Sequence, residues 1–321
     1  MRLIKTAVYG VCKTAKKIRA QANKPYLVTV ADIIWCAIRY GASPNNYYKF
    51  DFYKIGHDLR KTYVTHRISR RLIRKYNQKA YCAVFEDKAQ FARKFTDRFR
   101  RDFMEFPGDG EEAYRRFTEG RTRFICKPLG GAQGQGIAIV DGRVPTFREL
   151  ADNLKGDYIL EAYIDQHEAL DQYYDKAINC IRVVTICKDG KVTPIVANIT
   201  YSTGHKVANA SFGGITCLVD VQTGEVTTPG GAYGHILSDT HPCTGIPLQG
   251  FVIPHWNDVL EMVDDLARRI PQVGYVGWDI AISKDGPVVI EGNTSPGYTF
   301  FQIPQLLPGQ VGTIEKYKPF L

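Results

Sequence analysis

The chain has 321 residues, of which 44% are hydrophobic and 12% aromatic, enough apolar material to bury a large core in two or three lobes. No stretch reaches the roughly 20 uncharged apolar residues of a membrane-spanning helix, no secretory signal pattern opens the chain, and the eight cysteines follow no zinc-site or disulfide spacing, so we expect a cytoplasmic protein. The net charge of +9 combines a basic part, with 29 Lys and Arg against 12 Asp and Glu over residues 1–127, and an acidic remainder with 13 against 21.

Helical spacing of apolar residues dominates residues 1–82, where we expect a basic, mainly helical N-terminal region. The glycine and proline in residues 41–46 predict a loop or the start of a helix. Residues 59–76 repeat the helical pattern between arginines, and residues 87–103 are predicted to form one further basic helix. Such clustered charge either lies on solvated helix faces or attracts an anionic partner such as nucleic acid, anionic lipid or an acidic substrate.

The first predicted helix is amphipathic and basic. Residues 1–19 contain six lysines and arginines and no acidic residue, while Ile4, Val8 and Val11 supply a small apolar stripe. Because basic amphipathic helices bind anionic membrane surfaces, we predict peripheral contact with the inner face of the membrane. The alternative is that this helix packs on the body and exposes its lysines to water. No zinc-finger, RNA-recognition or KH signature accompanies the charge, so we expect no nucleic-acid partner.

Short β-rich runs replace the helical pattern after Gly120 and predict an α+β body. Residues 189–190, 222–224 and 284–286 have the composition of hairpin turns, and residues 254–270 have the period of a helix. The predicted strands are residues 124–127, 136–140, 158–161 and 180–186.

A lysine, a glycine-rich loop and a second strand form the first candidate site. Lys127 ends one predicted strand, and Gly130, Gly131, Gly134 and Gly136 follow it. Backbone N–H groups that no side chain obstructs can approach phosphate oxygens closely, so the loop is suited to cover a triphosphate. The lysine precedes the glycines and a strand follows them, which excludes the P-loop and the Rossmann fingerprint. The alternative is a glycine-rich hairpin with an incidental lysine.

Three oxygen-bearing side chains form the second candidate site. Residues 277–293 predict a hairpin with Asp279 on its first strand, and the two-residue spacing of Glu291 and Asn293 directs both to one face of the second. Mg²⁺ prefers such hard oxygen ligands, and a carboxylate in an apolar strand is unfavourable to bury unless it is paired or metal-bound. We therefore predict that Asp279, Glu291 and Asn293 bind Mg²⁺, with a purely structural pairing as the alternative.

These motifs resemble the ATP-grasp superfamily, and in detail the sugar-transfer-associated ATP-grasp family of polysaccharide-synthesis proteins. The resemblance covers about residues 47–304 and is most specific at residues 127–136, 158–164, 179–185 and 277–297. The last segment is also similar to the end of the D-alanine:D-alanine ligases. The resemblance implies an α+β ATP-grasp fold, in which two lobes clasp ATP after the helical region. We place the lobe with the phosphate loop at residues 83–165 and the lobe with the metal site at residues 166–321.

The resemblance also implies a nucleotide site. Its positions are Lys88, Lys127, Gly130, Gly131, Gln133, Gly134, Gly136, Glu161, Tyr163, Ile164 and Glu168. The two lysines would contact the phosphates, Glu161 would accept a hydrogen bond from the adenine amino group, and the backbone at Tyr163 and Ile164 would bind the adenine edge. Glu168 would bind the ribose hydroxyls, unless it is a solvated loop carboxylate.

Arg182 is, with Lys127, the candidate catalytic cation. The D-alanine:D-alanine ligases carry an arginine two residues before the first metal-binding aspartate, whereas this chain has Gly277 there. Arg182 lies in an otherwise apolar strand, where an arginine needs an anionic partner. The alternative is an ion pair with one of the chain's own carboxylates. Candidate contacts to the acceptor substrate, or else ordinary turn residues, are Asn209, Ser211, Gly213, Thr294 and Ser295.

The implied activity is that of a ligase that uses ATP and Mg²⁺ to join a carboxylate to an amine. ATP-grasp ligases convert the carboxylate to an acyl phosphate, which the amine then attacks, so charge neutralisation matters more than a nucleophilic side chain. The expected partners are a small-molecule or glycan-linked acid, such as a sugar acid or polysaccharide precursor, and an amine. A kinase on the same fold, phosphorylating a carbohydrate hydroxyl, would use the same residues. A nucleic-acid-binding protein built on the basic region is the remaining alternative.

Overall fold

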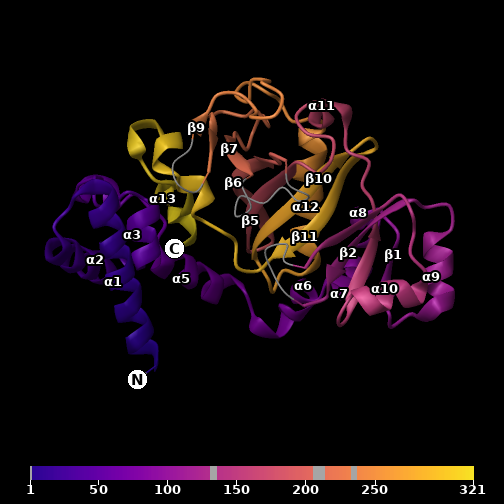
Figure 1. Ribbon diagram of the computed structural model, residues 1–321. Coiled ribbons are helices and arrows are strands. Elements are labelled where there is room, and N and C mark those ends of the chain that lie inside the picture. Colours follow the sequence, from indigo (N-terminus) through magenta and orange to yellow (C-terminus); the bar gives the residue numbers. More distant parts are fainter. Residues whose placement is uncertain (1, 131–135, 205–213, 233–236) are drawn as a thin grey trace.

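The computed structural model describes residues 2–130, 136–204, 214–232 and 237–321 (Figure 1). Its helices are α1 (Arg2–Ala22), α2 (Tyr26–Tyr40), α3 (Pro44–Lys49), α4 (His57–Arg60), α5 (His66–Tyr76), α6 (Ala83–Glu86), α7 (Lys88–Lys94), α8 (Thr96–Phe99), α9 (Gly110–Thr118), α10 (Phe147–Asn153), α11 (Glu168–Asp171), α12 (Trp256–Arg269) and α13 (Ile314–Tyr317). Its strands are β1 (Phe103–Phe106), β2 (Arg123–Pro128), β3 (Ala138–Asp141), β4 (Tyr158–Ala162), β5 (Cys180–Lys188), β6 (Lys191–Tyr201), β7 (Ile215–Val219), β8 (Gly230–Gly231), β9 (Leu237–Ser238), β10 (Tyr275–Ser283) and β11 (Gly286–Asn293).

The smaller sheet has four antiparallel strands in the order β1-β4-β2-β3. Its core is built from residues that alternate along the strands, such as Met104 and Phe106 on β1 and Phe124 on β2, packed with Tyr114 of α9 and Leu150 of α10. This sheet lies at one end of the molecule, and the N-terminal helices α1 to α3 lie at the other (Figure 1). Strand β2 of this sheet ends at Lys127 and Pro128, so the small sheet positions the lysine that precedes the phosphate loop.

The prediction of a single helix over residues 87–103 is wrong. Two short helices, α7 and α8, replace it, and Arg100 follows them in the left-handed region with φ 49°. Strand β1 then begins at Phe103 and pairs with β4. The burial of Met104 and Phe106 in the small-sheet core outweighs the local helical pattern, because helix propensity is a weak preference that tertiary packing overrides.

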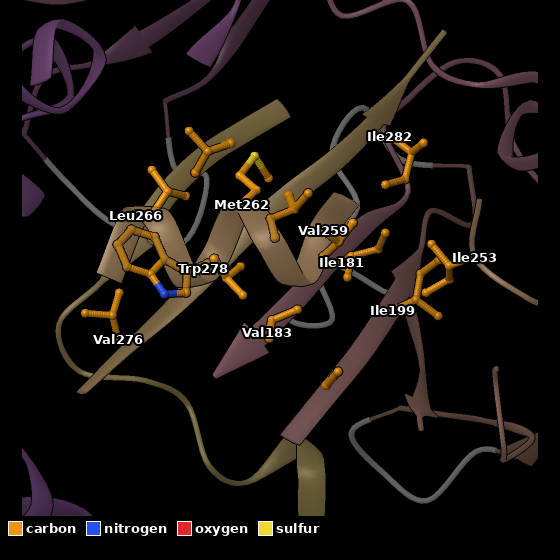
Figure 2. Close-up of a cluster of buried hydrophobic side chains, with 14 of the residues drawn as sticks. Ile181, Val183, Ile199, Ile253, Val259, Met262, Leu266, Val276, Trp278 and Ile282 are labelled. Atoms are coloured by element: carbon orange, nitrogen blue, oxygen red, sulfur yellow. The ribbon is translucent and has the colours of Figure 1, made fainter. Parts of the chain in front are cut away.

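The larger sheet has seven strands in the order β11-β10-β5-β6-β7-β8-β9, each pair antiparallel. Helix α12 lies across one face and buries Val259, Met262 and Leu266 against the strands (Figure 2). On the same face Trp278 of β10 also contacts the ring of Phe95, which joins α7 to α8, at 6.1 Å between ring centroids. This face of the sheet is therefore hydrophobic core. The opposite face carries a second apolar cluster, where Val184 and Tyr275 pack with α5, α13 and the C-terminal segment, and beside that cluster the polar side chains of Arg182 and Asp279.

Local turn chemistry agrees with the sequence at the hairpins. Residues 189 and 190 link β5 to β6 with φ values of 52° and 76°, both in the left-handed region that this kind of tight turn requires. Gly286 follows the turn between β10 and β11 with φ 103°, and Gly224 follows β7 with φ 75°. The predicted helix at residues 254–270 is confirmed as α12.

The N-terminal region is helical, as predicted. Helices α1 to α3 share a core that includes Ala15, Ile18 and Ile33, and Ser43 caps α3 by accepting a hydrogen bond from the Asn46 amide at 3.2 Å. Residues 61–65 separate α4 from α5, so the pattern over residues 59–76 corresponds to two helices. The C-terminal segment after β11 packs back on this region and on the large sheet, which joins the helices to the two-sheet body.

Candidate active site

Asp279, Glu291 and Asn293 converge on one face of the β10–β11 hairpin. Asp279 is directly opposite Glu291 in the register, and the Asn293 Nδ2 atom lies 3.2 Å from Asp279 Oδ2 and 3.2 Å from Glu291 Oε1. The two-residue spacing that suggested the trio does place Glu291 and Asn293 side by side. The proposed Mg²⁺ ligands therefore form one cluster, although their role as ligands stays a prediction.

The electrostatics of the trio suit a hard cation. Burial raises the pKa of Glu291, and the adjacent Asp279 carboxylate raises that pKa further. Two carboxylates and one amide offer the oxygen donors that Mg²⁺ prefers, since a half-turn of the Asn293 amide would present Oδ1 in place of Nδ2. Within the described ranges no three His, Cys, Asp or Glu side chains are arranged to hold a metal ion. The two carboxylates would therefore need the Asn293 amide as their third ligand.

Arg182 of β5 binds one member of this trio, Asp279. Its Nε donates to Asp279 Oδ1 at 2.6 Å and its Nη2 to Asp279 Oδ2 at 2.5 Å, a bidentate pair. Burial lowers the pKa of Arg182, but the contact with Asp279 outweighs burial and the pKa is raised. The ion pair that the sequence left open as an alternative is thus present, and its partner is a candidate metal ligand.

The space beside Gly277 is filled by that same arginine. A Cβ atom added at Gly277 would lie 3.6 Å from Arg182 Cδ and 3.3 Å from Pro296 Cβ. One added at Gly297 would lie 3.6 Å from Arg182 Nη1. The Arg182 side chain therefore lies beside both Gly277 and Gly297.

A row of polar side chains continues across the large sheet from this cluster. The register pairs Glu291 with Asp279, Asp279 with Arg182, and Arg182 with Asn198 of β6, so all four lie on one face. Asn198 is 4% exposed, and its Oδ1 atom accepts no hydrogen bond from any described residue. Because a buried amide oxygen normally has a partner, Asn198 is suited to accept a hydrogen bond from a substrate. Sequence reasoning missed it.

Lys127 faces a buried carboxylate on the neighbouring strand. Its Nζ donates to Glu161 Oε2 at 2.8 Å, and Arg101 Nε donates to the same oxygen at 2.8 Å. Burial raises the pKa of Glu161, but Arg101 and Lys127 reverse this effect and the pKa is lowered. Glu161 is therefore a charged group held by two cations. Its predicted contact with adenine stays a prediction.

Arg101 joins the two sheets, and sequence reasoning also missed it. Its side chain is only 4% exposed and stacks on the Phe99 ring, with 3.3 Å from Cζ to the ring centroid. It binds Glu161 on β4 of the small sheet, and its Nη1 donates to the carbonyl of Val289 on β11 at 2.9 Å. Val289 precedes Glu291 by two residues on β11, so Arg101 connects the Lys127 side of the candidate site to the strand that carries Glu291.

Lys88 is the first residue of α7. Asp87 caps this helix by accepting hydrogen bonds from the Ala89 and Gln90 amides. The Lys88 Nζ donates to the Pro128 carbonyl, at the end of β2, at 2.8 Å. Burial lowers the pKa of Lys88, Lys127 lowers it further, and the Glu291 and Glu161 carboxylates oppose both. Lys88 therefore interacts electrostatically with both Lys127 and the Glu291 carboxylate.

Part of the phosphate loop is described. Gly136 has φ 75°, and a Cβ atom there would lie 2.8 Å from Pro128 Cγ, so the position requires glycine. Gly130 is exposed, and nothing lies within 4 Å of the Cβ it lacks. The predicted positions Gly131, Gln133 and Gly134, and the acceptor positions Asn209, Ser211 and Gly213, lie outside the described residues.

A cavity of about 130 Å³ lies after the end of β4. Tyr163 and Ile164 line it, as do Arg123, Asp171 and Lys284. The Arg123 guanidinium sits 3.6 Å from the Tyr163 ring centroid, and Ile164 packs against Ala281 and Val288 of the large sheet. The segment predicted to bind adenine therefore lies where the two sheets meet. The remaining predicted position, Glu168, is exposed at the start of α11 and does not line this cavity.

The family model of sugar-transfer associated ATP-grasp proteins matches residues 67–310, about three quarters of the chain. The chain belongs to this family. Its two sheets with the cluster between them are therefore an ATP-grasp fold, and α1 to α4 precede the matched region. No curated protein matches the sequence.

Solved ATP-grasp ligases show distant likeness. The chain is similar to the VanG D-Ala:D-Ser ligase from Enterococcus faecalis (15% identity, TM-score 0.45, covering 72% of this chain and 58% of that one) and to the D-alanine–D-alanine ligase from Helicobacter pylori (12%, 0.44, 77% and 64%). It is also similar to the ATP-grasp ligase PsnB, complexed with a phosphomimetic variant of its minimal precursor, Mg and ADP (17%, 0.41, 75% and 61%). In each case the match spans less than two thirds of the other chain.

Within this ATP-grasp chain the last two predicted acceptor positions follow the metal trio directly. Thr294 is partly buried, and its carbonyl accepts a hydrogen bond from the Asn77 side chain at 2.8 Å. Ser295 is exposed. Asn77 also holds the backbone of Tyr275 on β10, so the loop after Asn293 is tied to the strand that carries Asp279.

Proposed function

We propose that the protein is a Mg-ATP-dependent ligase that activates a carboxylate for amide formation. The observation that carries the proposal is the polar row Glu291–Asp279–Arg182–Asn198, which places a carboxylate pair, a guanidinium and an unsatisfied amide on one sheet face. Lys88 and Lys127 approach this row from the small-sheet side, close enough for each to act on the Glu291 carboxylate. Such an array can neutralise a triphosphate and an acidic substrate together.

The chain's own groups divide the work of holding ATP. Lys88 and Lys127 would offset phosphate charge in a partly desolvated site, where charge-assisted hydrogen bonds are strongest. The glycine loop around Gly136 would cover the phosphates with backbone amides. Tyr163 and Ile164, at the junction of the sheets, would bind the adenine.

Asp279, Glu291 and Asn293 would hold Mg²⁺. When bound, the metal ion supplies positive charge at the phosphate oxygens during transfer. Arg182 keeps one carboxylate of this set oriented through its bidentate contact with Asp279. Its remaining donor face lies toward Gly297, where an acidic substrate can be bound.

The reaction needs no nucleophilic side chain. An oxygen of the substrate carboxylate attacks the γ-phosphorus, the bond to the bridging oxygen breaks, and ADP leaves with that electron pair. The amine nitrogen then attacks the acyl carbon, inorganic phosphate leaves, and the nitrogen loses a proton to give the amide. Lysines and Arg182 would stabilise the negative charge that develops in both steps.

The substrate class we propose is a sugar acid or a glycan-linked polysaccharide precursor, together with an amine. The family description and the excess of Lys and Arg over Asp and Glu in the N-terminal region support this substrate class, because both suit an acidic carbohydrate partner. We place the enzyme in the cytoplasm, with peripheral contact at the inner face of the membrane, where lipid-linked precursors would be reached. None of the described helices has the length and apolar content needed to cross a bilayer.

The reaction is tested by ATP turnover across panels of sugar acids and amines, with mass spectrometry of the products. Phosphate release that requires the amine, with an amide product, supports the ligase. A stable phosphorylated carbohydrate formed without amine would show a kinase and overturn the proposal.

Glu291→Gln removes one candidate metal ligand without changing side-chain size. We expect turnover to fall by more than ~100-fold with an unchanged fold, because a metal ligand contributes at least as much as the residues that orient it. Glu261→Gln, on the exposed side of α12, is the control and should retain wild-type turnover. Circular dichroism of both variants checks the fold, and wild-type turnover in Glu291→Gln would remove the metal assignment.

A further inference from the structure

Helix α2 is apolar on the side that faces solvent. Its five large exposed side chains are Leu27 (77% exposed), Val28 (64%), Ile34 (47%), Trp35 (45%) and Ile38 (71%). At 100° per residue these positions, with the exposed Ala31 between them, fall within one side of the helix. No charged residue interrupts this surface, which we call the α2 outer face.

The opposite side of α2 is the one that packs in the core. Thr29, Ile33 and Cys36 are buried there against α1 and α3. The single acidic residue of the helix, Asp32, is engaged by Arg60 at 2.7 Å and by the Tyr47 hydroxyl at 2.6 Å. The α2 outer face is therefore additional apolar surface, beyond what the helix needs for folding.

The region that carries this face is strongly basic. Residues 1–82 contain 18 Lys and Arg and only 3 Asp and Glu. All three acidic residues form ion pairs within the region, Asp32 with Arg60, Asp51 with Lys54 and Asp58 with Lys61. The basic excess is thus not neutralised inside the region.

Cations also stand at both ends of α2. Lys24 precedes the helix and is exposed, and Arg39 is exposed in its last turn. The exposed Arg67 donates from Nη2 to the carbonyls of Ala37 and Ile38 at 2.8 and 2.9 Å. A flat apolar face bordered by cations matches an anionic lipid surface, in which acyl chains lie beneath negatively charged headgroups.

Of the stripe predicted on the first helix, Ile4 lies outside the residues whose side chains are described. Val11 of α1 is partly buried and packs on the same core as Ala15 and Ile18, although Val8 stays 56% exposed. The described part of the α1 stripe thus offers one large exposed aliphatic side chain, Val8, whereas the α2 outer face offers five large apolar ones. If the N-terminal region contacts a membrane, the apolar contact is made by α2.

We propose that the α2 outer face docks the protein on an anionic membrane, with α2 lying in the plane of the interface. A helix of 15 residues is about 22 Å long, too short to span the hydrocarbon core but suited to lie at its surface. Trp35, whose ring contacts Tyr40 at 5.3 Å, provides the aromatic group that interfaces favour. A second copy of the chain fits less well, since a two-fold contact would bring Lys24, Arg39 and Arg67 against their own like charges.

The inference does not rest on the proposed reaction, because its readout is binding. Co-sedimentation of the full chain with phosphatidylglycerol-containing vesicles and with pure phosphatidylcholine vesicles, at low and high salt, is the first measurement. We expect binding to the anionic vesicles that weakens in high salt, and little binding to the neutral ones. Absence of binding to both at low salt would overturn the proposal.

Tryptophan fluorescence identifies the part of the chain that inserts. The chain has three tryptophans, and Trp256 and Trp278 are 5% and 0% exposed, so only Trp35 can meet lipid without unfolding. We expect quenching by brominated lipid in anionic vesicles and loss of that quenching in Trp35→Phe. Vesicle binding without quenching would show that another surface binds and would overturn the assignment to α2.

The double variant Leu27→Ser/Ile38→Ser tests the apolar face directly. Both side chains are exposed, so the fold should stay intact by circular dichroism, and anionic-vesicle affinity should fall at least ~10-fold. Val252→Ser, equally apolar and 56% exposed in the large-sheet lobe, is the matched control and should bind as wild type. Self-association that depends on Leu27 and Ile38, with no vesicle binding, would instead make the face a contact between copies.

Discussion

At the residue scale, the site depends on how buried charges are shared. Glu161 is 2% exposed and would be unfavourable there as an isolated anion, but Arg101 and Lys127 both bind it. Arg101 is more deeply buried than Lys127, with 4% and 12% of their side chains exposed. Arg101 can therefore carry the structural part of the neutralisation, which leaves Lys127 available for phosphate.

Arg101→Met should separate these two parts. Removing one of the two cations leaves the buried Glu161 carboxylate with Lys127 alone, so we expect the free energy of unfolding to fall by up to about 3–5 kcal/mol. Arg115→Met is the control, since Arg115 pairs with Glu112 on the exposed surface of α9 and its loss should change stability little. Urea denaturation of the two variants measures the difference.

Equal stability changes in the two variants would contradict the structural role of Arg101. Nucleotide affinity adds a second readout, measured by calorimetry with a non-hydrolysable analogue. It should fall in Arg101→Met, because Glu161 then attracts Lys127 without competition and holds it away from phosphate.

How far the site could be predicted depends on how its residues are connected. Glu291 and Asn293 were found because their spacing along one strand decides that they share a face. Asn198 lies next to Arg182 only through the β5–β6 register, and Arg101 reaches Glu161 and Val289 from a loop before β1. Neither set of contacts can be inferred from the local sequence, so both residues could be identified only from the structure.

At the element scale, two turns have the same backbone conformation and different surroundings. Gly190 has φ 76° between β5 and β6, and Gly224 has φ 75° after β7. Nothing lies within 4 Å of a Cβ added at Gly190, whereas a Cβ at Gly224 would be 2.4 Å from Cγ of Trp256. Trp256 begins α12 and donates its indole N–H to the Val221 carbonyl at 3.0 Å, so this turn positions the start of α12.

A comparison of Gly190→Ala with Gly224→Ala therefore separates the free-energy cost of backbone strain from that of the steric conflict with Trp256. Both variants carry the strain of a left-handed alanine, about 1 kcal/mol. Only Gly224→Ala must also displace Trp256, which should destabilise the protein by a further ~1–3 kcal/mol. Thermal unfolding of both variants and the wild type measures the two terms, and equal losses would show that the Trp256 contact relaxes freely.

Element prediction succeeded where the pattern is local and long. Helix α12 was predicted from the helical spacing of five apolar residues, all of which are buried: Val259, Met262, Val263, Leu266 and Ile270. Strand β1 was missed because its four residues follow a basic helical pattern, and only the pairing with β4 and the small-sheet core select the extended form. Short strands that depend on distant partners are therefore the least predictable part of this fold.

At the scale of the whole molecule, the C-terminal segment connects regions that are far apart in sequence. Tyr298 packs in the cores of both the N-terminal helices and the large sheet, and its hydroxyl accepts a hydrogen bond from Asn46 at 3.1 Å. Asn77, just after α5, binds the loop that follows the metal trio. The basic helical region is thus joined to the loop beside the β10–β11 trio, and a surface bound by α2 would fix the orientation of the whole candidate site.

The two sheets should respond to nucleotide as one body. ATP analogue with Mg²⁺ would contact Lys88 and Lys127 on one side and the β10–β11 trio on the other, and a ligand that binds only the folded state stabilises it by mass action. At a ligand concentration of ~100 Kd the stabilisation is about 2.7 kcal/mol, which corresponds to several degrees in Tm for a chain of this size or smaller. Lys88→Ala and Lys127→Ala should each lose most of that shift, because each removes a charge-assisted contact to phosphate.

Lys155→Ala, at an exposed position before β4, removes a lysine without touching the site and should keep the full shift. Differential scanning fluorimetry with and without Mg²⁺ and analogue decides the matter: a full shift in both site variants would mean that these lysines do not bind the phosphates.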